Sequence, residues 1–282
     1  MATDSPADSA KLWQSDLAGI ELFQAQLVHH RFGKHFHETY TIGLNEAGQG
    51  CSQHHGANQL HYPGSFKLIN PGDLHTGQVA AAEGWAFRNL YISLPVIEQV
   101  LAQLEWPRSG WPYFPEPVTW APALRPRFYQ LFSALQTHQP LMAQESLLLE
   151  LLCGLFQNHG EQRVTLRSPQ PEAKAIAQAR AYLEAHYADT VSINDLAQQV
   201  NLSPYYLIRS FRQQVGCPPH HYQRHWQLQQ VKQALHTEQP LAEIAAEQGF
   251  YDQSHLNRVF KQTFGVTPGQ YQKGNSVQYA PA

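Results

Sequence analysis

The sequence predicts an α+β protein with two domains: an N-terminal β-barrel followed by helices, and an all-α C-terminal domain. Residues 20 to about 92 contain short segments of β-branched and aromatic residues between turn signals such as EAGQG, YPG and NPGD, which is typical of a small antiparallel barrel or sandwich. The Ser- and Pro-rich segment RSPQPEA at 167–173 indicates a linker. Beyond it, apolar residues recur only at helical spacing.

Length and composition support the same division. A chain of 282 residues with 43% hydrophobic residues exceeds the usual size of one hydrophobic core. The expected boundaries are 1–160 for the first domain, 161–172 for the linker and 173–275 for the second domain. The three cysteines are scattered and show no CxxC spacing, which argues against a disulfide framework and against a cysteine zinc site.

The charge is distributed unevenly between the two halves. Residues 1–170 carry 10 Lys and Arg against 14 Asp and Glu, and residues 171–282 carry 9 against 8, so the net charges are −4 and +1. A charge of +1 is too small to indicate a nucleic-acid partner by itself. No apolar run approaches the roughly 20 residues of a membrane span, and the N-terminus lacks the features of a signal peptide. We therefore expect no membrane partner and a cytoplasmic location.

Two helical runs are predicted between the barrel and the linker, LRPRFYQLFSALQTH and LMAQESLLLELLCGLF. The second carries leucines nearly all round, so it must be buried by its own domain or by another subunit. On this basis we expect a homodimer with contacts through the helices at about 123–159.

A repeat in the second domain relates DLAQQVNLSPYYLIRSFRQQVGCPPHHYQ to EIAAEQGFYDQSHLNRVFKQTFGVTPGQYQ. Leu196-Ala197 matches Ile244-Ala245 at an offset of 48 residues. The offset then becomes 49 and relates six residues of the first copy to six of the second: Leu207, Arg209, Phe211, Gly216, Pro219 and Tyr222 to Leu256, Arg258, Phe260, Gly265, Pro268 and Tyr271. Each copy is predicted to be a helix, a tight turn and a helix, with a small alanine that lets the two helices approach closely.

The second helix of each copy carries side chains that suit DNA. In the helix-turn-helix geometry this helix lies in the major groove, and its exposed side chains reach base edges. Asn257 suits adenine, and Arg209 or Arg258 suits guanine or a phosphate. Each of these residues alone fits a solvated surface equally well, but two copies at fixed spacing favour DNA binding. Phosphate contacts are expected from residues nearer the helix ends, Arg212 and Lys261.

These two stretches resemble the double helix-turn-helix domain of the AraC/XylS family of transcription regulators. The resemblance implies double-stranded DNA and RNA polymerase as partners, and activation more than repression. It implies base-facing positions in both recognition helices: Tyr205, Ile208 and Arg209 in the first, and Gln253, Ser254, His255, Asn257 and Arg258 in the second. Ile208 departs from the polar residue usual there, so a contact with a thymine methyl is the expectation for it.

Three histidines stand out in the first domain, in GKHFHETY and GSFKLINPGDLHTG. His35 and His37 alternate along a predicted strand, and His75 follows a Pro-Gly turn that brings the chain back across the barrel. Three converging imidazoles would suit zinc, iron or another divalent ion. The arrangement is similar to the cupin barrel, but the glutamate that metal-binding cupins place beyond the second histidine is missing. A three-histidine metal site therefore stays open beside the favoured alternative, histidines that face a ligand or are hydrogen-bonded in the core.

The segment WAFRNLYIS places Trp85, Phe87, Asn89 and Tyr91 on one strand face, either as core aromatics or as the wall of a pocket for a small polar molecule. The residues expected to contact a small-molecule effector are His35, His37, His75, Phe87 and Asn89. No assembled catalytic constellation and no phosphate-binding loop appears in the sequence. The leading interpretation is a transcription regulator whose cupin-like barrel senses an effector, with no cofactor assigned. The alternatives are a metal-dependent cupin enzyme with an appended DNA-binding domain, and a DNA-binding protein whose barrel only dimerises.

Overall fold

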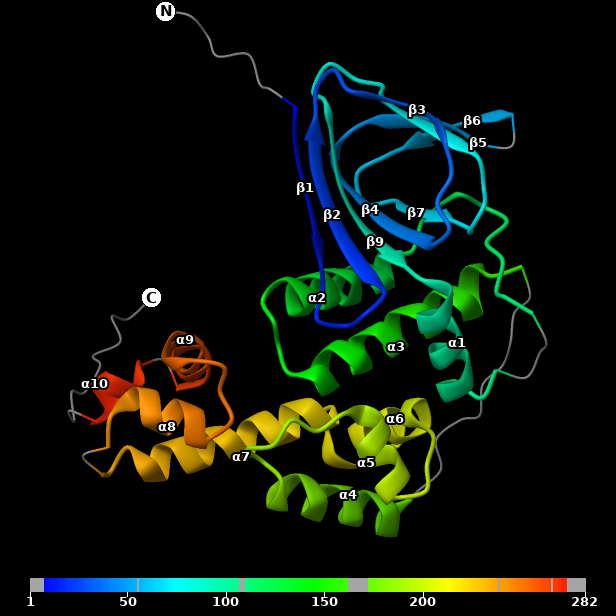
Figure 1. Cartoon of the computed structure of the whole chain (residues 1–282). Coiled ribbons are helices and arrows are strands. Elements are labelled where there is room, and N and C mark those ends of the chain that lie inside the picture. The colour runs from blue at the N-terminus through cyan, green and yellow to red at the C-terminus, as the bar shows by residue number, and fades with distance from the viewer. Residues whose placement is uncertain are drawn as a thin grey trace, which may run out of the picture. The chain divides into compact units, whose positions relative to one another are not determined.

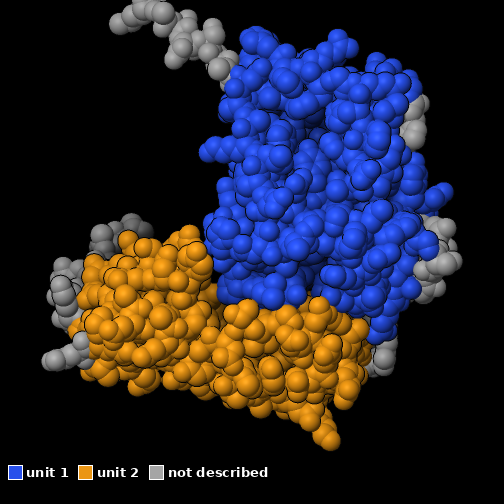
Figure 2. All heavy atoms as spheres, in the orientation of Figure 1, with its two compact units in different colours: residues 1–168 blue, residues 169–282 orange. Residues whose placement is uncertain are grey.

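The structure is a computed structural model of the chain, and it describes residues 8–54, 56–106, 110–161, 172–237, 239–264 and 266–272. The chain divides into two compact units, residues 1–168 and residues 169–282 (Figure 2). Most of the expected linker, the repeat residue Gly265 and the last residues of the expected second domain lie outside the described residues.

Unit 1 is β-rich, with two antiparallel sheets (Figure 1). The strands are β1 (Ser9–Gln14), β2 (Ile20–Leu27), β3 (Arg31–His35), β4 (Tyr40–Gly48), β5 (Gly50–His54), β6 (Ala57–His61), β7 (Phe66–Ile69), β8 (His75–Val79), β9 (Trp85–Ile92) and β10 (Val118–Thr119). The larger sheet has the order β1-β2-β9-β4-β7-β10 and the smaller one β3-β8-β5-β6. The predicted β-rich domain is confirmed, and β1 and β10 extend it beyond the predicted residues 20–92.

Strand β9 lies in the middle of the larger sheet, paired with β2 on one side and β4 on the other. Because successive side chains of a strand point to opposite faces, its odd-numbered and even-numbered residues face different surroundings. Trp85, Phe87 and Asn89 are buried on one face, and Leu90 and Ile92 are buried on the other. Both faces of the larger sheet are therefore covered at this strand.

The helices of unit 1 cover one face of the larger sheet. They are α1 (Leu94–Gln103), which the sequence did not predict, α2 (Arg125–Gln136) and α3 (Leu141–His159), with a 3-10 turn at Pro122–Leu124 before α2. Phe128 of α2 packs edge-on against Phe66 of β7, with ring centroids 5.7 Å apart. Five of the seven leucines in α3 are buried within the single chain, and Leu141 and Leu147 are half-buried. The leucine content of α3 therefore does not by itself require a second subunit.

The described residues of unit 2 form helices and no strands. The helices are α4 (Ala173–Ala185), α5 (Ile193–Gln199), α6 (Pro204–Val215), α7 (Pro219–Ala234), α8 (Leu241–Glu247), α9 (Gln253–Phe264) and α10 (Pro268–Gln272). Each copy of the repeat forms a helix pair, α5 with α6 and α8 with α9. Ala197 and Ala245, the small residues of the two copies, are both buried. No helix in the described part of the chain is long and apolar enough to cross a membrane.

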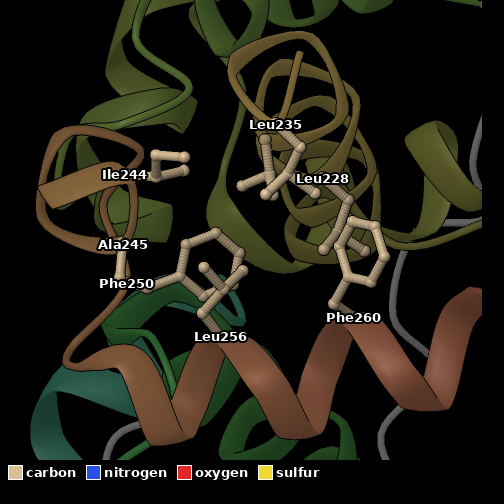
Figure 3. Close-up of a cluster of buried hydrophobic side chains, with 8 residues drawn as sticks. Leu228, Leu235, Ile244, Ala245, Phe250, Leu256 and Phe260 are labelled. Carbon is tan, nitrogen blue, oxygen red and sulfur yellow. The ribbon is translucent and has the colours of Figure 1, made fainter. Parts of the chain in front are cut away.

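The second helix pair is held to α7 by one apolar cluster (Figure 3). Its buried members come from α7 and the residue that follows it, from α8 and α9, and from the turn between α8 and α9: Leu228, Val231, Leu235, Ile244, Ala245, Phe250, Leu256 and Phe260. Leu256 and Phe260 lie one helical turn apart, so they project from the same face of α9. Burial of this face leaves the opposite face of α9 in contact with solvent.

Phe260→Ala removes the largest side chain that α9 contributes to this cluster. We expect the free energy of unfolding to fall by about 3–5 kcal/mol, because the lost ring leaves a cavity between packed helices. Tyr251→Ala is the matched control, since Tyr251 is 81% exposed and its removal creates no cavity. Urea denaturation followed by circular dichroism measures both changes, and equal losses in the two variants would contradict the packing described.

Candidate functional site

A cavity lies inside the barrel, with a wall made by both sheets. The lining residues are Phe23, Phe32, His35, His37, Thr41, Ser52, Lys67, His75, Thr76, Gly77, Trp85, Phe87, Asn89 and Tyr91. The wall thus brings together the five residues expected to contact an effector: His35, His37, His75, Phe87 and Asn89. The cavity volume is about 40 Å³. That is room for an ion or a few water molecules, whereas sites for organic ligands measure about 300–1,000 Å³, so a metabolite requires wall side chains to move.

The three histidines converge at one end of this cavity. His35 ends β3 and lies directly opposite His75, the first residue of β8. His37 lies two residues beyond the end of β3, so the predicted alternation of His35 and His37 along one strand is wrong. The chain nevertheless turns His37 inward, and one ring nitrogen from each histidine lies within 4.8 Å of the other two.

Backbone carbonyls fix the orientation of two of these rings. Nδ1 of His35 lies 2.8 Å from the carbonyl oxygen of Gly33, and Nδ1 of His75 lies 2.9 Å from that of Asp73. A carbonyl oxygen only accepts hydrogen bonds, so Nδ1 carries a proton in both rings, and in a neutral ring the lone pair is then on Nε2. Burial lowers the pKa of His37 and of His75 to about 4, which leaves both rings uncharged at neutral pH.

Lys67 was not among the residues predicted from the sequence, yet its amine belongs to the same wall. Its Nζ lies 4.5 Å from the ring centroid of Phe87 and 5.5 Å from that of Trp85. Burial lowers the pKa of this amine to about 7. The sequence did contain a signal, because Lys67 interrupts an otherwise apolar strand, FKLI, in which every residue is buried.

Two further polar atoms of the wall have no hydrogen-bond partner. They are the hydroxyl oxygen of Thr41 and the amide oxygen of Asn89, both on buried side chains. The amide nitrogen of Asn89 donates a 3.1 Å hydrogen bond to the Tyr91 hydroxyl. Buried polar atoms are normally paired, so unpaired ones in a cavity wall are suited to a ligand that supplies the missing partner.

Helix α9 carries the second set of predicted residues. Asp252 caps the start of this helix, since the backbone N–H of His255 donates a 2.6 Å hydrogen bond to its carboxylate. The exposed residues of the predicted set on this helix are Gln253, Ser254, Arg258 and Lys261, and Asn257 is partly exposed.

His255 is a correction to the sequence-based prediction of a base-facing residue. Its side chain is only 9% exposed, and its ring lies 5.6 Å from that of Phe250. Nδ1 accepts a 3.4 Å hydrogen bond from the backbone N–H of Tyr251, and burial lowers the pKa of the ring to about 4. His255 therefore stabilises the turn before α9 and offers no exposed group to a base.

The first recognition helix, α6, differs from the second. The guanidinium of Arg209 lies over the ring of Tyr205, 5.4 Å from its centroid, and donates a 3.3 Å hydrogen bond to the Tyr205 hydroxyl. Arg212 is exposed at the end of the helix. Ile208 has no exposed surface, so the predicted contact with a thymine methyl is wrong for this structure. Burial of an apolar side chain is favourable, whereas Asn257 at the matching position of α9 stays partly exposed.

Comparison with known proteins assigns each unit to a described domain. Residues 17–152 match the model of the AraC-like ligand binding domain, and residues 196–274 match the model of a helix-turn-helix domain. The two matches fall on the unit that contains the cavity and on the unit that contains the repeated helix pairs.

Relatives match over most of the chain. An uncharacterized helix-turn-helix transcriptional regulator of Bacillus subtilis (strain 168) is 30% identical over 240 residues, which is 84% of this chain and 86% of the relative. The arabinose operon regulatory protein of Escherichia coli (strain K12) is 28% identical, over 83% of this chain and 80% of the relative. The helix-turn-helix transcriptional activator RhaS of Escherichia coli O81 (strain ED1a) is 24% identical, over 86% of this chain and 88% of the relative.

Both matched domains occur in this chain in the order that these relatives share, ligand-binding domain first. The family consists of transcription regulators and not of enzymes, so the alternative of a metal-dependent enzyme is set aside. The chain belongs to the AraC family of transcriptional regulators, with an AraC-like ligand-binding domain and a helix-turn-helix DNA-binding domain.

Proposed function

We propose that a small molecule bound in the barrel cavity controls how the helical unit binds DNA. The observation that carries this proposal is the cavity itself, where three histidines, a buried amine and two unpaired polar atoms face a common space. For the effector to regulate, it must bind one state of the protein more tightly than another, and the difference in binding free energy sets the size of the response.

The wall chemistry supports a polar effector with oxygen acceptors. The described lining contains no Asp or Glu, whereas the Lys67 amine can donate hydrogen bonds to an acceptor on the effector. Phe23, Phe32 and Phe87 supply an apolar surface for the rest of the molecule. A small molecule that carries a carboxylate or another oxyanion on an apolar body matches the polar and the apolar parts of this wall.

We assign base reading mainly to α9. Asn257 offers the amide geometry that pairs with adenine, and Arg258 offers the fork that reads guanine, while Gln253 and Ser254 lie beside them at the start of the helix. On α6, Tyr205 and Arg209 form one stacked unit that suits a base or its phosphate. Phosphate contacts are assigned to Arg212 and Lys261, which lie in the last turns of their helices.

Other parts of the proposal concern partners. Transcriptional activation through RNA polymerase is supported by the similarity to relatives that include a named activator. A homodimer is proposed through α2 and α3, where the Tyr129 ring of α2 lies beside Arg88 of β9 and keeps 39% of its surface exposed. We place the protein in the cytoplasm, because a transcription regulator acts where its DNA is.

The test of the DNA-reading proposal is Asn257→Ala. Mapping of the tagged protein's genomic contacts first supplies a binding site, and gel-shift titrations then compare every single-base variant of that site. We expect the substitution to relax preference at one base pair, with a loss of about 1–3 kcal/mol there, because the bidentate contact to one base disappears.

Gln262→Ala is the matched control for Asn257→Ala. It truncates another amide of α9 about 140° round the helix, and should leave every base preference unchanged. Equal weakening of Asn257→Ala on all sequences would assign Asn257 to the backbone instead. Absence of sharp genomic sites for a folded protein would refute the regulator's proposed mode of DNA reading.

Lys261→Ala tests the phosphate assignment. A phosphate contact releases counterions, so its removal should weaken binding to all sequences alike and lower the salt slope of log K by about 1. Lys11→Ala removes the same charge from an exposed strand of unit 1 and should leave the slope unchanged. A wild-type slope in Lys261→Ala would show that Lys261 does not contact the backbone.

Lys67→Met tests the buried amine. The pKa of Lys67 is lowered from 10.5 to about 7, so between those pH values the unfolded chain binds more protons than the folded chain. The contribution of Lys67 to the free energy of unfolding therefore rises with pH, and the destabilisation caused by burying its amine is fully present below pH 7. We expect Lys67→Met to be more stable than the parent protein at pH 6–7, by a margin that shrinks by up to about 1.4 kcal/mol per pH unit above that.

Urea denaturation without effector measures this margin by fluorescence, since five of the six tryptophans lie in residues 1–168. Lys11→Met, at an exposed position, should show no such pH dependence. A margin that is constant from pH 6 to pH 10 would mean that Lys67 is solvated in the folded protein.

A further inference from the structure

The histidine end of the cavity has a chemistry of its own. We propose that His35, His37 and His75 bind one divalent transition-metal ion, of the zinc class, inside the sensor barrel. This goes beyond the binding of an organic effector, because it assigns an inorganic ligand to three named side chains. The metal site is inferred from the positions and hydrogen bonds of the three rings and does not depend on the residues assigned to DNA binding.

The distances fit an ion with a small adjustment of the rings. A zinc–nitrogen bond is about 2.0–2.1 Å, so two imidazole nitrogens around a tetrahedral ion lie about 3.3 Å apart. The three ring nitrogens here lie within 4.8 Å of one another. Closing that difference requires each nitrogen to approach the centre by less than about 1 Å. The cavity of about 40 Å³ also suits an ion with its water.

The hydrogen bonds of the rings match those of metal ligands. A histidine that binds a metal almost always donates its other ring N–H to a carbonyl or carboxylate, which fixes the tautomer and the ring plane. His35 and His75 both do so, through Nδ1, to the carbonyl oxygens of Gly33 and Asp73. The two residues also lie opposite each other on paired strands, so the backbone holds them in register before any ion arrives.

A purely structural role explains these rings less well. His61 of the same barrel gives a comparison: it is fully buried, stacks on Trp85 and pairs Nε2 with the Ser52 hydroxyl at 2.8 Å, while its Nδ1 is buried without a hydrogen-bond partner. In His35 and His75, by contrast, no described protein group is hydrogen-bonded to Nε2. One nitrogen of each of the three rings lies within 4.8 Å of the other two, a spacing that a cation with imidazole ligands can bridge.

The protein supplies three ligands and leaves the remaining coordination position open. Described carboxylates are absent from the cavity wall, which explains why the cluster contains imidazoles alone. A site with three protein ligands and one open position is the arrangement that accepts an exchangeable oxygen ligand. If the proposed effector carries an oxyanion, that oxygen is the group that fills the open position, a step that rests on the proposed function.

The experiment counts metal on the purified full-length protein without a histidine tag. The protein is stripped with chelator, dialysed against micromolar Zn²⁺ and then against metal-free buffer, and its zinc content is measured by elemental analysis. We expect one ion per chain. Co²⁺ serves as a spectroscopic probe and should give the visible absorption of a low-coordinate nitrogen site.

Variants assign the ion to these residues. His37→Ala and His35→Ala remove ligands from half-buried positions and should each weaken Zn²⁺ binding at least tenfold. His29→Ala removes an exposed histidine of the same unit and should bind like the parent protein. Since His75 is buried, His75→Gln is checked by circular dichroism first, and the Co²⁺ spectrum of the parent protein tests the site without any substitution.

The outcomes separate this inference from the proposed function. No retained Zn²⁺, or retention that is unchanged in His37→Ala and His35→Ala, would overturn the metal site even if an organic molecule alters DNA binding. One ion per chain that is lost in both variants would establish the site, even if no effector and no specific DNA sequence were found.

Discussion

The two-sided burial of β9 is the constraint on which unit 1 depends. One face of the strand gives Trp85 and Phe87 to the barrel interior, and the other gives Leu90 and Ile92 to the helix-covered side of the sheet. A strand buried on both faces has no solvent-exposed side on which a shift of register would be tolerated, because a slip by one residue would exchange the two sets. The position of the cavity wall is therefore fixed by the packing of the opposite face, because the same strand contributes to the cavity wall and to the core.

Period-two alternation let the sequence predict much of this wall, and it failed where the chain leaves the strand. The shared face of Trp85, Phe87 and Asn89 follows from alternation alone. His37 joins His35 and His75 by a turn of the chain beyond β3, and no sequence period describes a turn. Lys67 was missed for another reason: a lysine suggests an exposed position, and only its apolar neighbours indicated that this one is buried.

The helical unit was predicted better, because its repeat fixes the pairing of its helices. The matched residues Leu207 and Leu256 are both fully buried, as the repeat requires. Exposure on the recognition helices was harder to predict, since the flank of a helix is covered or open according to its neighbours. His255 is polar yet belongs to the turn that Phe250 anchors, and Ile208 is buried where Asn257 is not. Two copies of one motif thus present different surfaces.

A glycine accounts for how a lysine and an asparagine share the cavity wall. Gly43 of β4 lies opposite Lys67 on one neighbouring strand and opposite Asn89 on the other. A Cβ atom at Gly43 would lie 2.4 Å from the Asn89 amide oxygen and 3.1 Å from Cε of Lys67, so any larger residue would displace the polar groups. Glycine weakens the interior of a strand and usually marks a close approach. The absence of a side chain at Gly43 leaves room, between paired strands, for polar groups that an ordinary apolar core would exclude.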